Sequence, residues 1–291
     1  MLVIKAFISS VQELQANLSD FTSIFQHTDG KFSTSHRIPI FFWRHQSKIK
    51  HTFNNNQSIF TELETVESVN SLTKDGFSLG IILHQDVVRE IVSLTRNLPC
   101  YGNEKIDRSF YFWEKEEAQT KYGEVFANAV YNDAALLSPV IQNLESDPKL
   151  LEIATKYLGT NSIHKRHRLW WKFAEESNLY ERRRAAQMFD DNLNGCRGVT
   201  FFFYLTDVNL CSSPHVCVRG SHVKKKLSHL FLRRGITYQQ ITQYYGYQNI
   251  VPICGKAGFG FVTDTRCLQK ANPPGSKDRL ILEIEFRVRD K

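Results

Sequence analysis

The sequence predicts an α+β fold in which helices come first and a β-sandwich or barrel follows. Up to about residue 160, apolar residues recur at helical spacing beside capping residues. From about residue 168 the pattern changes to short apolar strands separated by turn residues. The last strand, residues 280–289, alternates side chains between an apolar face and a mostly charged one. Helices followed by many strands indicate this fold class.

Two segments divide the chain, residues 1–70 and residues 71–291. Phe7, Val11, Leu14, Leu18, Phe21 and Phe25 form an apolar stripe at helical spacing. The stripe stops after about three turns, which favours a helix packed on the main body over a dimer seam. Residues 28–70 are polar and Asn-rich. We therefore expect an N-terminal helical extension laid over the main domain, which begins near Lys74–Phe77.

Three helices are expected in the main domain from their capping signals. Asp86 is expected to cap a helix that carries Val87, Val88, Ile91 and Leu94. Asp147 followed by Pro148 begins another helix, which Gly159 ends. Thr237 starts a short helix that runs towards Tyr245.

Five strands are expected after them. They cover residues 168–173, 199–205, 216–218, 258–262 and 280–289. The run Val199–Leu205 is almost entirely apolar, which suits a strand buried on both faces.

Composition places the chain among ordinary folded proteins. Of 291 residues, 42% are hydrophobic and 23% charged, enough for a sizeable core. No apolar run approaches the ~18 residues of a membrane span, so no membrane role is expected. The first residues lack the features of a signal peptide. The six cysteines are irregularly spaced without a C-x-x-C pair, which favours reduced thiols and a cytoplasmic location.

The net charge of +7 is concentrated in four basic runs. They are residues 164–168, 182–184, 224–226 and 233–234. These runs are either a solvated face or a positive rim that steers an acidic partner, such as an acidic carrier protein or a coenzyme A thioester. They lack interleaved aromatics, and no helix-turn-helix pattern stands out, so nucleic acid is not an expected partner.

Six short motifs, in order, carry a resemblance. They are Gln187–Phe189, Tyr204–Val208, Val218–His222, Gly255–Gly258, Asp264–Arg266, and Pro273–Pro274 with Arg279–Leu280. Over residues 70 to 291 this order resembles the phytanoyl-CoA dioxygenase-like family of Fe(II)- and 2-oxoglutarate-dependent oxygenases. The resemblance implies a double-stranded β-helix, which is a jelly-roll or cupin-like barrel, flanked by helices.

The resemblance also implies where iron ligands would lie, and all three positions differ. The family's His-x-Asp falls at Asp190 and Asn192, and its second histidine falls at Gln269. A one- or two-residue shift does not restore them, because the histidines nearest to Asp190 are His167 and His215. One carboxylate and two amides suit Fe(II) poorly. We therefore expect no metal and no cofactor, with Asp190 a possible general acid or base; Fe(II) and 2-oxoglutarate are the alternative.

Other positions that the resemblance marks are retained. Arg279 stands ten residues after Gln269, where the family grips the distal carboxylate of 2-oxoglutarate. Otherwise it is a surface arginine opening the last strand. Thr200 is a further candidate for an anionic ligand, and Asp264 and Arg266 are expected to form a structural pair. The candidates for lining the pocket are Gln187, Phe189, Trp170, Trp171, Phe202, Tyr204 and Arg266, although one of the two tryptophans is expected in the core.

A zinc site is a rival interpretation of one stretch. Cys211, His215, Cys217 and His222 supply suitable ligand atoms, although their spacing matches no known zinc knuckle or finger. The alternative is an ordinary strand with buried thiols.

Three functions follow from these observations. The first is a divergent family member that binds a small organic metabolite in the barrel, either without catalysis or with a metal-independent, redox-neutral step. The second is an active Fe(II)/2-oxoglutarate-dependent oxygenase, a hydroxylase-type tailoring enzyme with an unusual ligand set. The third is a pseudoenzyme that acts as a protein-interaction partner. The sequence leaves open whether the protein is an enzyme.

Overall fold

A computed structural model describes residues 57–132, 134, 138–161, 163–174, 188–189, 197–212, 214–225, 236–271 and 277–288. All of these belong to one compact unit, residues 49–291. The helix expected from Phe7 to Phe25 lies outside the described residues.

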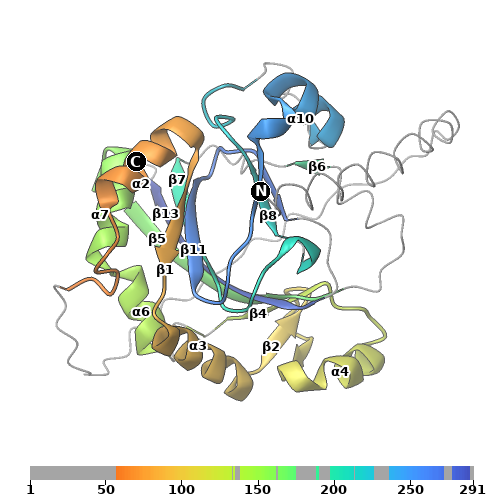
Figure 1. The fold of residues 1–291 in the computed structure, drawn as a ribbon. Coiled ribbons are helices and arrows are strands. Elements are labelled where there is room, and N and C mark those ends of the chain that lie inside the picture. The colour runs from red at the N-terminus through yellow and green to blue at the C-terminus, as the bar shows by residue number, and fades with distance from the viewer. Residues whose placement is uncertain are drawn as a thin grey trace, which may run out of the picture. The chain divides into compact units, whose positions relative to one another are not determined.

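The described unit is built on a large antiparallel sheet and a small one (Figure 1). The large sheet has the strand order β1-β11-β7-β13-β5-β4-β2-β3. Its strands are β1 (Phe77–Ile82), β2 (Cys100–Gly102), β3 (Ser109–Phe110), β4 (Asn128–Tyr131), β5 (Ile163–Lys172), β7 (Gly198–Tyr204), β11 (Phe259–Asp264) and β13 (Arg279–Val288). The small sheet has the order β10 (Ile250–Ile253), β8 (His215–Val218), β12 (Gln269–Ala271). A separate pair joins β6 (Met188–Phe189) to β9 (Ile236–Thr237).

Helices pack on the outer face of the large sheet, away from the small sheet (Figure 1). They are α2 (Thr65–Asp75), α3 (Gln85–Asn97), α6 (Pro139–Glu145) and α7 (Pro148–Leu158). Two further helices are α4 (Lys115–Tyr122) and α10 (Tyr238–Tyr245), and short 3₁₀ turns cover Phe112–Glu114, Leu210–Ser212 and Tyr247–Asn249. No helix within the described ranges is long and apolar enough to cross a membrane.

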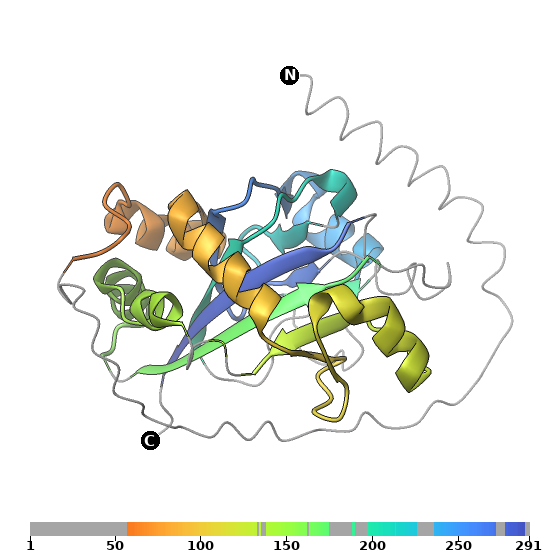
Figure 2. The same ribbon diagram turned by 90° about the horizontal axis from the view of Figure 1, so that it is seen from below.

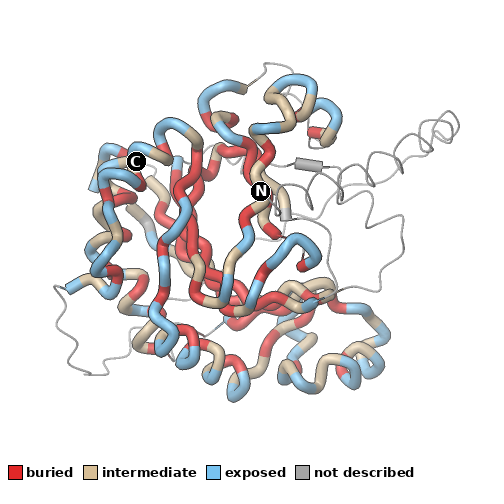
Figure 3. Tube along the Cα trace, in the orientation of Figure 1, coloured by how far each residue is buried: buried red, intermediate tan, exposed pale blue. Residues whose placement is uncertain are grey.

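The central strands separate two hydrophobic clusters because their side chains alternate between faces. On β7, Val199, Phe201 and Phe203 join the core under the helices, whereas Phe202 and Tyr204 face the small sheet. All seven residues of β7 are buried, which confirms the strand predicted to be buried on both faces (Figure 3). The predicted α+β jelly roll is likewise confirmed.

The last strand alternates as the sequence predicts. Leu280, Leu282, Ile284 and Phe286 are fully buried under the helices. Strand β13 pairs with β5 along its whole length, and Figure 2 shows these two long strands side by side. We call the face of the large sheet that looks towards the small sheet the inner face. From β13 it receives Arg279, Ile281, Glu283 and Glu285.

Most of the expected helix ends are confirmed. Asp147 caps α7 and Pro148 opens it, and the helix ends at Gly159 with φ 69°. Thr237 caps α10 through a capping box with Gln240. The cap expected at Asp86 is wrong by two residues, because the His84 side chain accepts the hydrogen bond from the Asp86 backbone N–H.

The residues just before α2 already pack on the main body. Phe60 is 3% exposed, and its ring stacks on Phe203 with centroids 5.8 Å apart. Ser58 Oγ donates to Asp147 Oδ1 at 2.9 Å, and the Ile59 N–H donates to Oδ2 at 3.0 Å. Asp147 therefore caps α7 and also holds this segment. The domain boundary at residue 70 stays a prediction.

Asp147→Ala should destabilise the fold by roughly 2–4 kcal/mol, since a helix cap and two further bonds to a charged acceptor are lost together. Asp147→Asn keeps one carbonyl oxygen, so its stability should lie between that of Asp147→Ala and that of the wild type. Urea unfolding measures both. The control is Asp86→Ala, an exposed aspartate in the first turn of α3, where a loss under about 1 kcal/mol is expected. Equal losses at the two sites would refute the double role of Asp147.

Candidate active site

The inner face carries an aromatic cluster into which polar groups project. Phe202 stacks on Phe261 at 5.0 Å between ring centroids, and the His215 ring lies 4.8 Å from Phe202. The Tyr204 hydroxyl donates to the Ile253 carbonyl at 2.9 Å and accepts from the His215 N–H at 3.2 Å. These bonds tie the large sheet to the small one, so the polar groups of both sheets are held in fixed positions.

Arg279, the first residue of β13, is 2% exposed. Its terminal Nη2 has no hydrogen-bond partner among the residues that the structure describes. Burial lowers the pKa of the guanidinium, and the nearby Tyr204 hydroxyl acts in the opposite direction. An unpaired buried cation is costly. Arg279 is therefore no surface arginine, and its free N–H group fits an anionic ligand such as a carboxylate.

Gln269, the position expected for the second iron ligand, contacts a histidine. His215 Nε2 lies 3.0 Å from Gln269 Oε1, and Thr263 Oγ1 donates to the same oxygen at 3.4 Å. Burial, assisted by the charge of Arg279, lowers the pKa of His215 to about 4, so the ring is neutral at pH 7 and donates through Nε2. The sequence did not predict this pair. The only indication in the sequence was that His215 and Cys217 lie on the same face of a strand.

These donors supply only part of the ligand set that binds iron in such sites. His215 and Gln269 offer one imidazole and one amide oxygen, which falls short of two histidines and a carboxylate. Within the described ranges, no three His, Cys, Asp or Glu side chains gather as a metal-binding group. Asp190 and Asn192 lie outside the described residues, as does Gln187. The backbone of Phe189 lies in β6, opposite Ile236.

The four candidate zinc ligands do not come together. His222 Nε2 bonds to the Thr73 carbonyl at 3.1 Å, whereas His215 bonds to Gln269. Cys211 is exposed and Cys217 is buried. The four residues thus point to separate environments, and the described cysteines are free thiols.

The two tryptophans of β5 lie on opposite faces. Trp170 packs against the inner cluster. Trp171 faces the helices, where its Nε1–H donates to the Tyr131 hydroxyl at 2.9 Å and its ring stacks on Phe112 at 4.0 Å. One tryptophan is therefore core, as expected, and Trp171 does not line the inner face. Neighbours in a strand cannot share a face.

Two other candidates are placed as follows. Thr200 is 7% exposed and pairs across the sheet with Thr263. Arg266 donates to both Asp264 oxygens, at 3.2 Å and 2.7 Å, and the Tyr157 hydroxyl also donates to Asp264. The predicted structural pair of Asp264 and Arg266 is confirmed, and it occupies the Arg266 guanidinium.

Within the described part of the basic runs, some of the basic side chains pair with acidic ones. His167 lies 2.5 Å from Glu145, and Arg168 forms an ion pair with Glu104. Residues 182–184 and 233–234 lie outside the described ranges. An acidic carrier protein or coenzyme A thioester at these runs stays a prediction.

Comparison with known proteins places the fold. No protein-family model and no curated protein matches the chain. Among solved structures, it is similar to the non-heme α-ketoglutarate-dependent carbocyclase SnoK of nogalamycin biosynthesis, with TM-score 0.52, 14% identity, and 80% of this chain and 87% of that chain covered. It is also similar to the epimerase SnoN in complex with Fe3+, α-ketoglutarate and nogalamycin RO, with TM-score 0.51, 15% identity, and coverage of 77% and 83%.

A third similar structure is EvdO2 from Micromonospora carbonacea var. aurantiaca, complexed with 2-oxoglutarate, with TM-score 0.51, 12% identity, and coverage of 80% and 94%. The chain thus shares the fold of these three solved structures. The expectation of no cofactor is wrong, because structures of this fold hold iron and 2-oxoglutarate. These are the alternative cofactors that the sequence left open.

Arg279→Met should stabilise the ligand-free protein by roughly 1–3 kcal/mol, because an unpaired buried cation is replaced by an apolar chain. Arg266→Met is the matched control and should lose at least about 1 kcal/mol, since it strips a partner from buried Asp264. Both are measured by urea unfolding at pH 7. A loss of stability in Arg279→Met would show that the guanidinium is already satisfied.

Proposed function

We propose that this protein is a 2-oxoglutarate-binding enzyme of the Fe(II)/2-oxoglutarate-dependent oxygenase superfamily, related to phytanoyl-CoA dioxygenase-like proteins and acting on a small organic molecule. The observation that carries the proposal is the Arg279 guanidinium, which is buried on the inner face with an unpaired N–H group. The order of sequence motifs and the shared fold support it.

In this proposal each inner-face residue has a physical task. Arg279 binds the distal carboxylate of 2-oxoglutarate, where low local polarity strengthens the ion pair. The Tyr204 hydroxyl accepts a hydrogen bond from the His215 N–H and so holds the backbone of His215 in place. Burial raises the pKa of this hydroxyl.

Iron, when bound, supplies the chemistry of dioxygen that side chains lack. On this chain the residues that would face it are His215, Gln269, Asp190 and Asn192. His215 and Gln269 are held by their mutual bond, which fixes the orientation of the amide. Asp190 and Asn192 carry the remaining oxygen donors in the sequence.

Titration calorimetry with 2-oxoglutarate tests the binding step. Arg279→Gln should weaken affinity at least about 30-fold, because the ligand carboxylate loses its cation, and Arg279→Lys should recover part of it. Arg219→Gln, which removes a surface arginine paired with Asp75, is the matched control and should bind like the wild type. The wild type failing to bind 2-oxoglutarate, with or without anaerobic Fe(II), would overturn the proposal.

Metal content after anaerobic incubation with Fe(II) and 2-oxoglutarate tests the cofactor. We expect iron to be retained by the wild type and largely lost from Asp190→Ala, together with consumption of 2-oxoglutarate by the iron-loaded wild type alone. Arg279→Met should keep iron but not consume 2-oxoglutarate at low concentration. Stoichiometric 2-oxoglutarate binding without any consumption would instead make the protein a binder on this fold.

A further inference from the structure

A second charged group, Glu283, lies on the same inner face as Arg279. The two residues are four positions apart on β13, about 13 Å along the strand at ~3.3 Å per residue. Glu283 stands between Arg168 of β5 and Phe202 of β7 in the register of the sheet. Its side chain is half-buried, so part of its surface is exposed.

Glu283 makes one hydrogen bond and no ion pair in the part of the chain that the structure describes. Trp170 Nε1–H donates to its Oε1 at 2.8 Å. Its Oε2 has no such bond. The next inner residue, Glu285, differs, because Arg287 Nε lies 2.7 Å from its Oε1. Glu283, unlike Glu285, is thus an inner carboxyl of β13 without an ion pair among the described residues.

The cation opposite Glu283 is engaged elsewhere. Arg168 pairs with Glu104, and its guanidinium lies 4.5 Å from the centroid of the Trp170 ring. Glu104 follows Asn103 in a turn where both residues have positive φ, 49° and 61°. Such a turn is costly for residues other than glycine and needs support from its surroundings.

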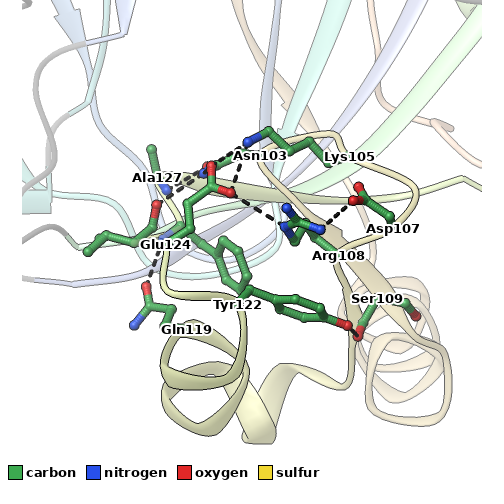
Figure 4. A network of polar contacts seen from close by, with 11 residues as sticks. Asn103, Lys105, Asp107, Arg108, Ser109, Gln119, Tyr122, Glu124 and Ala127 are labelled. Atoms are coloured by element: carbon green, nitrogen blue, oxygen red, sulfur yellow. Dashed lines mark hydrogen bonds and ion pairs between the residues drawn. The ribbon is translucent and has the colours of Figure 1, made fainter.

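That support comes from a polar network around Glu124 (Figure 4). Asn103 Nδ2 donates to Glu124 Oε1 at 2.9 Å, and Lys105 Nζ donates to the same carboxylate at 2.7 Å. Asn103 Oδ1 accepts from the Ala127 N–H at 2.9 Å. The network fixes the turn, the turn presents Glu104, and Glu104 forms an ion pair with Arg168. Glu283 is therefore left without an ion pair of its own among the described residues and shares the charge of Arg168 with Glu104.

Burial raises the pKa of Glu283, even though Arg168 and the Trp170 hydrogen bond act in the opposite direction. A ligand that brings its own positive charge would remove this penalty, whereas a neutral hydroxyl would leave the desolvated carboxylate uncompensated. Phe202, Ile281 and the Trp170 ring surround the carboxyl with apolar and aromatic surface, which suits an ammonium group on an apolar skeleton.

We propose that Glu283 binds the protonated amine of the substrate, so that the substrate class is an apolar primary amine. This deepens the proposed function and rests on it in one respect, namely that Arg279 is taken by the 2-oxo acid cosubstrate. The two sites then share one strand face, with a carboxylate-binding cation at its beginning and an ammonium-binding carboxylate further along.

Cyclohexylammonium and its neutral analogue cyclohexanol are the probes, titrated by calorimetry into the full chain with 2-oxoglutarate present. The wild type should bind the amine saturably at millimolar concentration, and Glu283→Gln should weaken that binding at least tenfold. Cyclohexanol should bind weakly and equally to both proteins. Trp170 fluorescence, isolated by subtracting Trp170→Phe, should change on amine binding, since its indole N–H is bonded to Glu283.

Glu104→Gln provides a second variant that leaves Glu283 in place. It releases Arg168, which can then neutralise Glu283, so amine affinity should fall while the unfolding midpoint changes little. Affinity for 2-oxoglutarate, measured in each variant, separates this inference from the proposed function, because it depends on Arg279 and not on Glu283. No saturable amine binding, equal affinity in Glu283→Gln, or equally tight cyclohexanol binding would each overturn the inference.

Discussion

The alternation of side chains along β7 and β13 is the constraint on which the rest of the structure depends. Because successive residues face opposite sides, one set of apolar side chains packs beneath the helices and the other set faces the small sheet. On β7 and β13 the outer face is apolar and supplies hydrophobic stabilisation. The inner face can therefore carry Arg279 and Glu283, charges that contribute no stability of their own.

Local signals in the sequence predicted what depends on neighbours in the chain. The Asp147–Pro148 cap, the end at Gly159 and the alternation of residues 280–288 each follow from short-range geometry, and the structure confirms them. The near misses are also local. His84 replaced Asp86 as the cap of α3, because capping preferences fix a helix start only to within a residue or two.

What the sequence could not supply was the register between strands. His215 and Gln269 are 54 residues apart and meet only because β8 pairs with β12. Which of Trp170 and Trp171 faces inwards depends on the pairing of β5 with β13, which no motif encodes. The roles of Arg168 and Glu104 required still more, since they depend on a turn held by Asn103 and Glu124. The sequence thus predicted that Arg279 belongs to the candidate site, but it did not predict how the residues of the site are arranged.

The inner face carries charges in an order that has a chemical meaning. A structural interior neutralises its ionic groups locally, as Glu285 with Arg287 and Asp264 with Arg266 do in this chain. Arg279 and Glu283 lie on the same β13 face, yet neither forms an ion pair among the described residues. They are also too far apart to neutralise each other, at about 13 Å along the strand. Two charges of opposite sign that lack ion pairs are most simply explained by two ligands of opposite charge, held in sequence along one strand.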